Sequence, residues 1–386
     1  MARAPVYLDC HATTPVDPRV LEAMLPYFTE HFGNPASAAH AWGWKAQAAV
    51  EQARRQVAAI VGAAPREIVF TSGATESNNL AVRGAALAAG DRRRVVVSAI
   101  EHKSVLEAAA HLVPLGFDVV TLPVTPEGVV DPAEAARLID PQTAVVSVMA
   151  ANNEIGTIQP LAEIGRLSRE AGAVFHVDAA QGAGKVPIDV EAMSIDLLSL
   201  TAHKIHGPKG CGALFVRRRV PLEPLIVGGG HERGVRAGTL NVPGIVGLGM
   251  ACALAQDERE ADCTRIGALR DRLLARLEAN LGGVTVNGTM QARLPHNLHV
   301  SFADVDGESL LIAIGDIAVS TGSACSSSSG RPSHVLEAIM AGKPVPSASV
   351  RFGLGRFTTP EEIEYAIDRF TSVVGHLRQT AGRLLT

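Results

Sequence analysis

The feature that most constrains the fold is an alternation of short apolar runs and helical segments through the first two thirds of the chain. Continuous apolar runs are typical of strands that are buried on both faces. Helix signals separate several of the runs, such as Asp131 followed by Pro132 as a cap and first-turn pair. The runs lie at residues 68–70, 95–97, 119–122, 144–149, 174–177, 195–200 and 212–216. This alternation predicts an α/β fold with a large, doubly wound, mainly parallel sheet.

The pattern changes after Asn241 to two long helical stretches and then to shorter strands, which predicts a smaller α+β domain. The helices are expected at 243–259 and 264–280, and the strands at 284–286, 297–302, 317–320 and 349–352. A chain of 386 residues is also longer than a single hydrophobic core usually supports. We therefore expect a large domain over 15–255 and a small domain formed by 1–14 with 256–386.

Composition excludes several other classes of protein. With 47% hydrophobic and 19% charged residues, the chain is an ordinary globular sequence. A net charge of -4 supplies no field for a nucleic acid, and no run approaches the ~18 apolar residues of a membrane span. We therefore expect no nucleic-acid partner, no membrane association and a cytoplasmic location. Five scattered cysteines without C-x-x-C spacing predict no disulfide framework and no metal site, so a special cysteine would act as a thiol.

Polar residues follow five of the predicted strands, where an open α/β sheet binds its ligands. Each segment alone has a structural alternative: the first could be a helix cap, and a lone histidine is often a surface residue. Asp178 ends an apolar strand and needs a cationic partner, whereas Lys204 is placed to form a Schiff base. The five segments are 71–79, 101–103, 152–156, 178–181 and 201–204. Together they indicate one shared ligand.

These segments carry a resemblance to a known family. From Tyr7 to the C-terminal helix, the chain resembles the pyridoxal-phosphate (PLP) cysteine desulfurases of the iron-sulfur-cluster and nitrogenase-assembly type, in the class V aminotransferase group of fold type I. Besides the five segments, the matching motifs are Tyr7-Leu8-Asp9, Ala12-Thr13-Thr14-Pro15, 32–37, 207–210, 228–233, Gly238-Thr239, Gly322-Ser323-Ala324-Cys325 and Arg351-Phe352.

The resemblance implies an enzyme that converts L-cysteine to L-alanine and leaves sulfane sulfur on Cys325 as a persulfide. It implies a PLP cofactor, a homodimer and a sulfur-acceptor protein, such as an iron-sulfur scaffold or a sulfurtransferase. Two alternatives stay open: another class V PLP enzyme, such as a selenocysteine lyase or an aminotransferase, and a non-catalytic scaffold that keeps the fold.

The resemblance also assigns roles to residues of this chain. Lys204 would bind PLP covalently and then move the Cα proton, Asp178 would pair with the pyridinium nitrogen, and His102 would stack on the ring and assist proton transfer. Gln181 would hydrogen-bond the ring hydroxyl, and Asn153 and Arg351 would bind the substrate carboxylate. Thr239 would bind the phosphate in the partner subunit's site. The phosphate in the chain's own site would be bound by Ala74, Thr75, Thr201 and His203.

Cys325 would decide the reaction, although an isolated cysteine is more often a small buried residue. Its neighbours from Ser320 to Gly330 have too little apolar content to form a core, which favours a loop that presents one thiol. The chain departs from the family pattern at Cys10-His11, where a small or polar pair is usual. Cys10 could therefore lie near the site, although a neutral substitution is the simpler interpretation.

Overall fold

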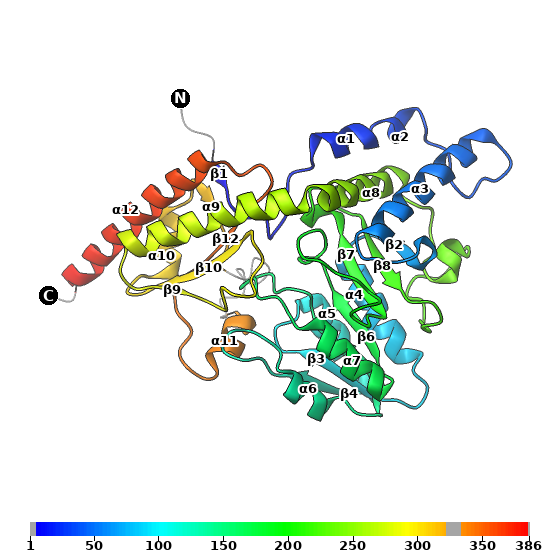
Figure 1. The fold of residues 1–386 in the computed structure, drawn as a ribbon, viewed down its shortest axis with the longest axis horizontal. Coiled ribbons are helices and arrows are strands. Elements are labelled where there is room, and N and C mark those ends of the chain that lie inside the picture. Colours follow the sequence, from blue (N-terminus) through cyan, green and yellow to red (C-terminus); the bar gives the residue numbers. More distant parts are fainter. Residues whose placement is uncertain (1–4, 322–332, 385–386) are drawn as a thin grey trace.

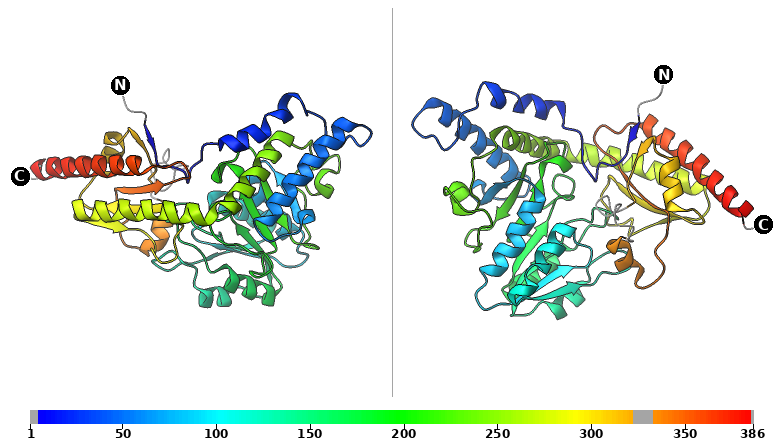
Figure 2. Two further views of the ribbon diagram at one scale, coloured as in Figure 1. Left: turned by 45° about the horizontal axis from the view of Figure 1, so that its top comes forward. Right: turned by 180° about the vertical axis from the view of Figure 1, so that it is seen from behind.

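The structure is a computed structural model that describes residues 5–321 and 333–384. It has two units, one built on a seven-stranded sheet and one on a three-stranded sheet (Figure 1). We call them the large unit (β2 to β8 with α1 to α8) and the small unit (β1 and β9 to β12 with α9, α10 and α12). Strand β1 and helix α12 come from opposite ends of the chain and lie together in the small unit (Figure 2).

The sheet of the large unit has the strand order β2-β8-β7-β6-β5-β3-β4. Pairing is parallel from β7 to β4, whereas β8 runs antiparallel to both of its neighbours. The strands are β2 (Ile68–Thr71), β3 (Arg94–Ser98), β4 (Asp118–Leu122), β5 (Thr143–Ser147), β6 (Val174–Asp178), β7 (Leu197–Thr201) and β8 (Gly212–Val216). The predicted mainly parallel, doubly wound sheet is confirmed, with each predicted strand in its place.

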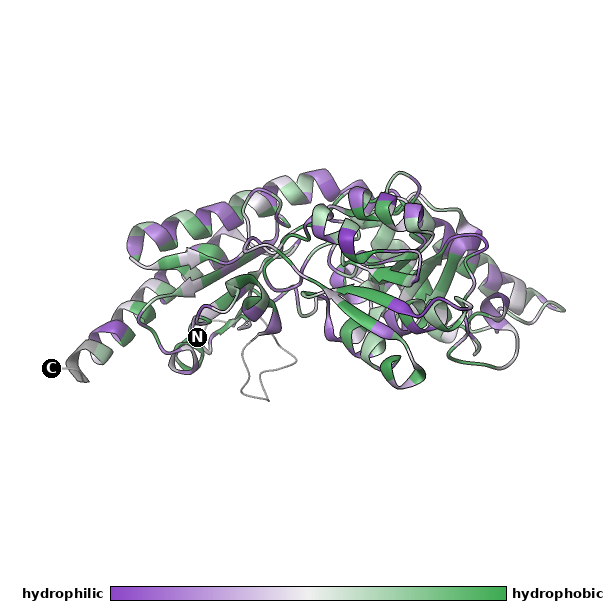
Figure 3. Ribbon diagram, turned by 90° about the horizontal axis from the view of Figure 1, so that it is seen from below, coloured by the Kyte–Doolittle hydropathy of each residue, from purple (hydrophilic) through white to green (hydrophobic). Residues whose placement is uncertain are grey.

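Helices cover both faces of this sheet because successive side chains of a buried strand point to opposite faces. Helices α4 (Ala74–Leu87) and α5 (Lys103–Ala110) pack on the face that includes Val95 and Val97, while Val96 belongs to the core on the other face. In Figure 3 the strands consist mostly of hydrophobic residues, whereas hydrophobic and hydrophilic residues alternate along the surrounding helices. Helices on that second face are α3 (Ala41–Ala59), α6 (Pro132–Leu138), α7 (Leu161–Ala171) and α8 (Val242–Asp257), with α1 (Pro18–Met24) and α2 (Pro26–Thr29) beside α8.

The small unit has a separate core formed by an antiparallel sheet and two long helices. Leu273, Leu277, Phe302 and Phe370 are buried in this core together with Leu8 from the beginning of the chain. Its sheet has the order β12-β10-β9, and β1 pairs in parallel with β11. The elements are β1 (Val6–Tyr7), α9 (Arg259–Asn280), β9 (Val284–Val286), β10 (Asn297–Phe302), α10 (Gly307–Ala313), β11 (Ile317–Ala318), α11 (His334–Met340), β12 (Ser349–Gly353) and α12 (Pro360–Leu384).

Helices provide two of the links between the units. Helix α11 packs against Ile100, Met149 and Ile155 of the large unit. Helices α8 and α9 meet at Glu258, which ends one helix and begins the other. The predicted division into 15–255 and 1–14 with 256–386 stays a prediction, since the helix break alone does not define independent domains.

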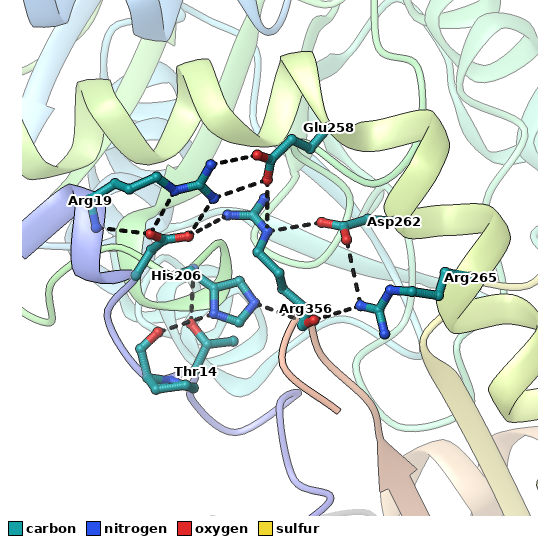
Figure 4. Close-up of polar contacts among 9 residues, drawn as sticks. Thr14, Arg19, His206, Glu258, Asp262, Arg265 and Arg356 are labelled. Atoms are coloured by element: carbon teal, nitrogen blue, oxygen red, sulfur yellow. Dashed lines mark hydrogen bonds and ion pairs between the residues drawn. The ribbon is translucent and has the colours of Figure 1, made fainter. Parts of the chain in front are cut away.

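A network of charged side chains lies at this junction (Figure 4). Arg356 Nη1 contacts Asp17 Oδ2 at 3.0 Å, and its Nε contacts Asp262 Oδ2 at 2.9 Å. Arg19 joins Asp17 at 2.8 Å and Glu258 at 2.6 Å. Because hydrogen bonds from Arg19 stabilise the carboxylate, the pKa of Asp17 lies well below its usual value of 3.8.

We expect Asp17→Asn to lower the free energy of unfolding by about 1–3 kcal/mol, because two arginines lose a buried charged acceptor. A depressed pKa in the folded state contributes stability above the unfolded pKa and loses it as the pH falls through the folded value. Thermal melting should therefore show a constant difference between the two proteins from pH 5 to 8 that shrinks below about pH 4. A difference that is absent at pH 7, or that grows in acid, would contradict this role for Asp17.

Candidate active site

A cavity of about 580 Å³ lies where the predicted strand-end segments meet. Strands β2, β3, β5, β6 and β7 run in one direction, so their carboxyl ends share one edge of the sheet. The lining includes residues from each of the five predicted segments, together with 11–13 and Arg351. The structure thus brings into one cavity Ala74, Thr75, His102, Asn153, Asp178, Gln181, Thr201, His203, Lys204 and Arg351.

Lys204 enters the cavity from a single 3-10 turn, Ala202–Lys204, that follows β7 directly. Its Nζ donates to the backbone carbonyl of Ala12 at 2.8 Å and also to that of His11. These carbonyls belong to the segment between β1 and α1, so the first residues of the chain hold the lysine. The amine is thereby oriented at the carboxyl end of a central strand, as the sequence predicts.

Asp178 is the last residue of β6 and is almost fully buried. Asn78 Nδ2 donates to its Oδ2 at 2.7 Å, and the backbone N–H of Ala180 donates to its Oδ1 at 2.9 Å. The carboxylate lines the cavity, where a cationic ligand would compensate its charge. Asn78 was not singled out from the sequence, because an asparagine on a helix carries no local signal of its partner a hundred residues away.

His102 caps α5 and takes its orientation from Ser104. The backbone N–H of Ser104 donates to His102 Nδ1 at 3.1 Å, so Nδ1 acts as an acceptor and the ring proton lies on Nε2. Burial lowers the pKa of His102 below its usual value of 6.5, although the nearby Asp178 raises it. A neutral ring with an Nε2–H therefore borders the cavity at neutral pH.

A short loop leads from β2 into α4. Gly73 caps that helix with φ +153°, a conformation that favours glycine, and a Cβ there would lie 3.7 Å from Thr201 Oγ1. Glu76 accepts from the backbone N–H of Ser72 at 2.8 Å and pairs with Arg236 at 2.8 Å. The first turn of α4, with Thr75, therefore faces the cavity beside Thr201.

Arg351 lies on β12 of the small unit and is 2% exposed. Its Nη1 donates to the backbone carbonyl of Asn153 at 3.0 Å, and its Nη2 pairs with Asp9 Oδ1 at 2.8 Å. The guanidinium is thus held between the two units at the edge of the cavity. Asp9 belongs to a motif noted in the sequence, but its pairing with a residue 342 positions away could not be predicted.

Two predicted site residues are not placed in the cavity by the structure. Thr239 is exposed, and it is not among the described residues that line the cavity. Cys325, with Gly322, Ser323 and Ala324, lies outside the described residues. Both assignments stay predictions.

Burial disfavours the thiolate form of the other four cysteines. Burial raises the pKa of Cys10 and of Cys211 to about 12, and it also raises the pKa of Cys252 and Cys263. Cys10 does lie near the site, since it lines a smaller cavity together with Lys204. A thiol with such a pKa stays protonated at neutral pH, so proximity alone does not make Cys10 reactive.

Comparisons with known proteins agree with this geometry. Residues 6–366 match the profile of the family described as Aminotransferase class-V. The chain belongs to this family. It is 56% identical over 380 residues, 98% of this chain and 94% of the relative, to a protein named cysteine desulfurase IscS from Anaeromyxobacter sp. (strain K).

Solved structures of related proteins share the fold. A NifS-like protein superposes with a TM-score of 0.90 at 39% identity and covers 97% of this chain and 100% of its own. The structure described as SspA in complex with cysteine has a TM-score of 0.79 at 38% identity and covers 92% of this chain and 100% of its own. The predicted family, fold class and assignment as a cysteine desulfurase are thereby confirmed. The described residues contain no helix that is long and apolar enough to cross a membrane.

Proposed function

We propose that this chain is a PLP-dependent cysteine desulfurase that converts L-cysteine to L-alanine and transfers the sulfur to Cys325. The observation that carries the proposal is the meeting of Lys204, Asp178, His102 and Arg351 in one cavity. The cysteine complex of the related SspA structure supports L-cysteine as the substrate. The relatives named cysteine desulfurase support the reaction.

The residues of the cavity fit PLP. The loop around Gly73 and the first turn of α4 offer backbone N–H groups and the Thr75 hydroxyl to a phosphate. Asp178 is buried and accepts two hydrogen bonds, as suits a carboxylate that pairs with a pyridinium N–H. Lys204 offers the amine for covalent attachment. When bound, PLP would supply an electron sink for the charge left at Cα.

The side chains of this chain would then divide the proton transfers. Lys204 would remove the proton from Cα, and Asp178 would hold a proton at the pyridine nitrogen. His102, neutral with its proton on Nε2, would border the ring and can donate that proton. Gln181 would donate to the ring hydroxyl.

Arg351 would bind the substrate carboxylate, with Asn153 beside it. A guanidinium can bind a carboxylate through two parallel hydrogen bonds. Here Asp9 pairs with Nη2, so Asp9 would orient the guanidinium for the incoming group. The location of Arg351 on the small unit means that binding would bring both units against the substrate.

The direct test is incubation of the purified protein with PLP, L-cysteine and a reductant. We expect alanine and sulfide in equal amounts. A scaffold would give neither, and an aminotransferase would consume cysteine only with a keto acid and form no alanine from it. Selenocysteine as the much better substrate would favour the lyase alternative.

Asp178→Ala should slow alanine formation by about a hundredfold or more, because the pyridine nitrogen would lose the group that keeps it protonated. The fold should survive, as judged by thermal melting, although Asn78 loses an acceptor. Asp118→Ala, at an exposed site on β4, is the matched control and should leave the rate unchanged. Turnover within a few-fold of wild type in Asp178→Ala would rule out the proposed pairing.

We also propose a homodimer. Three aromatic side chains that lie close in sequence are exposed on the large unit: Phe32 (66% exposed) after α2, and Trp42 (53%) and Trp44 (57%) at the start of α3. The rings of Phe32 and Trp42 are 5.0 Å apart. An exposed aromatic patch of this kind marks an interaction surface, and a second copy of the chain is the partner that the family suggests.

The dimer predicts that Thr239 completes the phosphate site of the partner subunit. Lys204→Ala chains and Thr239→Asp chains should each be inactive, the latter because a carboxylate repels the phosphate. Mixed in equal amounts and allowed to exchange, they should regain about a quarter of the wild-type activity, from one intact site in each mixed dimer. No recovery in a mixture whose mixed dimers are demonstrated by mass would contradict the shared site.

Two further assignments belong to this proposal. The sulfur would pass from Cys325 to an acceptor protein, either an iron-sulfur scaffold or a sulfurtransferase. The enzyme would act in the cytoplasm, where a reduced thiol is maintained. Capture of partners by the persulfide form, compared with Cys325→Ser, would identify the acceptor.

A further inference from the structure

His11 is a buried histidine that the reaction proposed above does not require. It is 1% exposed and lies at the edge of the cavity, between the large and small units. We infer that His11 is a positioning residue: it fixes the side-chain amide of Gln181 so that one N–H of that amide faces the cavity. The inference rests on the proposed function in one respect, that PLP supplies the oxygen which this N–H meets.

The direction of the hydrogen bonds is set at one end by an arginine, which can only donate. Arg293 Nη1 contacts Asn297 Oδ1 at 2.8 Å, and this contact identifies that amide atom as the oxygen. Asn297 Nδ2 must then be the donor at its other contacts, 3.0 Å from the carbonyl of Glu154 and 3.1 Å from His11 Nε2. His11 Nε2 is therefore an acceptor and carries no proton.

The other end is set by a backbone carbonyl, which can only accept. Gln181 Nε2 lies 3.0 Å from the carbonyl oxygen of His11, so this atom is the donor and Oε1 is the acceptor. His11 Nδ1 lies 3.0 Å from Gln181 Oε1 and must carry the ring proton. The two ends were assigned independently, and they require the same tautomer of His11.

The surroundings keep His11 in this neutral form. Burial lowers the pKa of His11 well below its usual value of 6.5, and the positive charges of Arg351 and Lys185 lower it further. The ring of His296 stacks on His11 with centroids 4.5 Å apart. The carbonyl of His11 also accepts from Lys204, so the same residue contacts the lysine and the glutamine.

One hydrogen of the Gln181 amide is used at the His11 carbonyl, and the amide has a second. Gln181 lines the cavity, and the described residues provide no other acceptor for this hydrogen. If the amide were reversed, its oxygen would face the carbonyl of His11 and its nitrogen would face the Nδ1 proton. His11 thus makes the orientation that donates into the cavity the stable one.

The tautomer can be measured without reference to any cofactor. In ¹⁵N-histidine-labelled protein, the His11 signal, identified by its loss in His11→Leu, should show a protonated Nδ1 and an unprotonated Nε2. It should not change between pH 6 and 8.5. A proton on Nε2, or a titration within this range, would overturn the inference whether or not the protein is a desulfurase.

The effect on Gln181 is tested by the visible absorbance of bound PLP as a function of pH. His11→Leu keeps the backbone carbonyl but leaves Gln181 Oε1 without its partner, so the amide is held at one end only. The pH midpoint of the absorbance change should then rise by about half a pH unit or more, because the ring oxygen becomes more basic when its donor is less well held. His11→Asn keeps an N–H that can reach Gln181 Oε1 and should restore the wild-type midpoint. His296→Leu is the control for lost packing and should also leave it unchanged.

A double-mutant comparison separates positioning from general damage to the fold. In a Gln181→Ala background, His11→Leu should move the midpoint by less than about 0.2 unit, because there is no amide left to orient. An equal shift in both backgrounds, or no shift in either, would overturn the inference. If wild type showed no PLP band at all, the proposed function would fail, while the tautomer result would still stand or fall by itself.

Discussion

Lys204→Ala should abolish covalent attachment of PLP and lower alanine formation by at least about a thousandfold. The reason is positional: Lys204 ends the 3-10 turn that follows β7, and it reaches the cavity that also contains Asp178 and His102. Loss of the amine would remove both the group that we propose bonds the cofactor and the base that we propose takes the Cα proton. Borohydride reduction followed by peptide mass spectrometry measures attachment, and a cysteine assay measures turnover.

Two other lysines, Lys103 and Lys209, line the same cavity and provide matched controls. Lys103→Ala and Lys209→Ala should each keep a reducible adduct on Lys204. Thermal melting must show that Lys204→Ala is folded, because its amine also bonds the carbonyl of Ala12. A reducible adduct that persists in Lys204→Ala would mean that another lysine is the attachment site.

The fold was largely predictable because its signals are local. Apolar runs such as 95–97 and 174–177 are buried on both faces, and they became β3 and β6. Element ends were less predictable. Helix α8 ends at Asp257 and α9 begins two residues later, whereas the apolar pattern alone suggested a break nearer 260. The strand expected at 317–320 has two residues, because β11 pairs only with the short β1.

The site was predictable to the extent that it depends on strand ends. Asp178 and Lys204 could be predicted because Asp178 directly follows an apolar run and Lys204 lies four residues after another, and parallel strands bring such positions together. The contacts of His11 could not be found in this way. Its partners Gln181 and Asn297 are 170 and 286 residues away, and nothing in a sequence states which pairs will be buried together. The contacts of His11 therefore had to come from the structure.

In the proposed reaction Cys325 accepts the sulfur, so Cys325→Ser should stop sulfur transfer while leaving the cofactor bound. Cleavage of the substrate C–S bond needs an acceptor for the sulfur, and a thiolate is a far better nucleophile than a thiol. It would form an S–S bond to the substrate sulfur, while the C–S electron pair stays with Cβ, which is then protonated to give alanine. A serine hydroxyl cannot replace the thiolate, so we expect a loss of sulfide release of at least about a hundredfold.

Mass spectrometry locates the sulfur. After brief exposure of wild type to L-cysteine without reductant, one added sulfur should be found on the peptide that contains Cys325. Cys10→Ser and Cys263→Ser are the matched controls and should keep normal rates, because burial raises the pKa of both thiols. Added sulfur on Cys10, or a normal rate in Cys325→Ser, would show that the substrate sulfur leaves without Cys325. The protein would then be a class V lyase acting on cysteine, with Cys325 outside its chemistry.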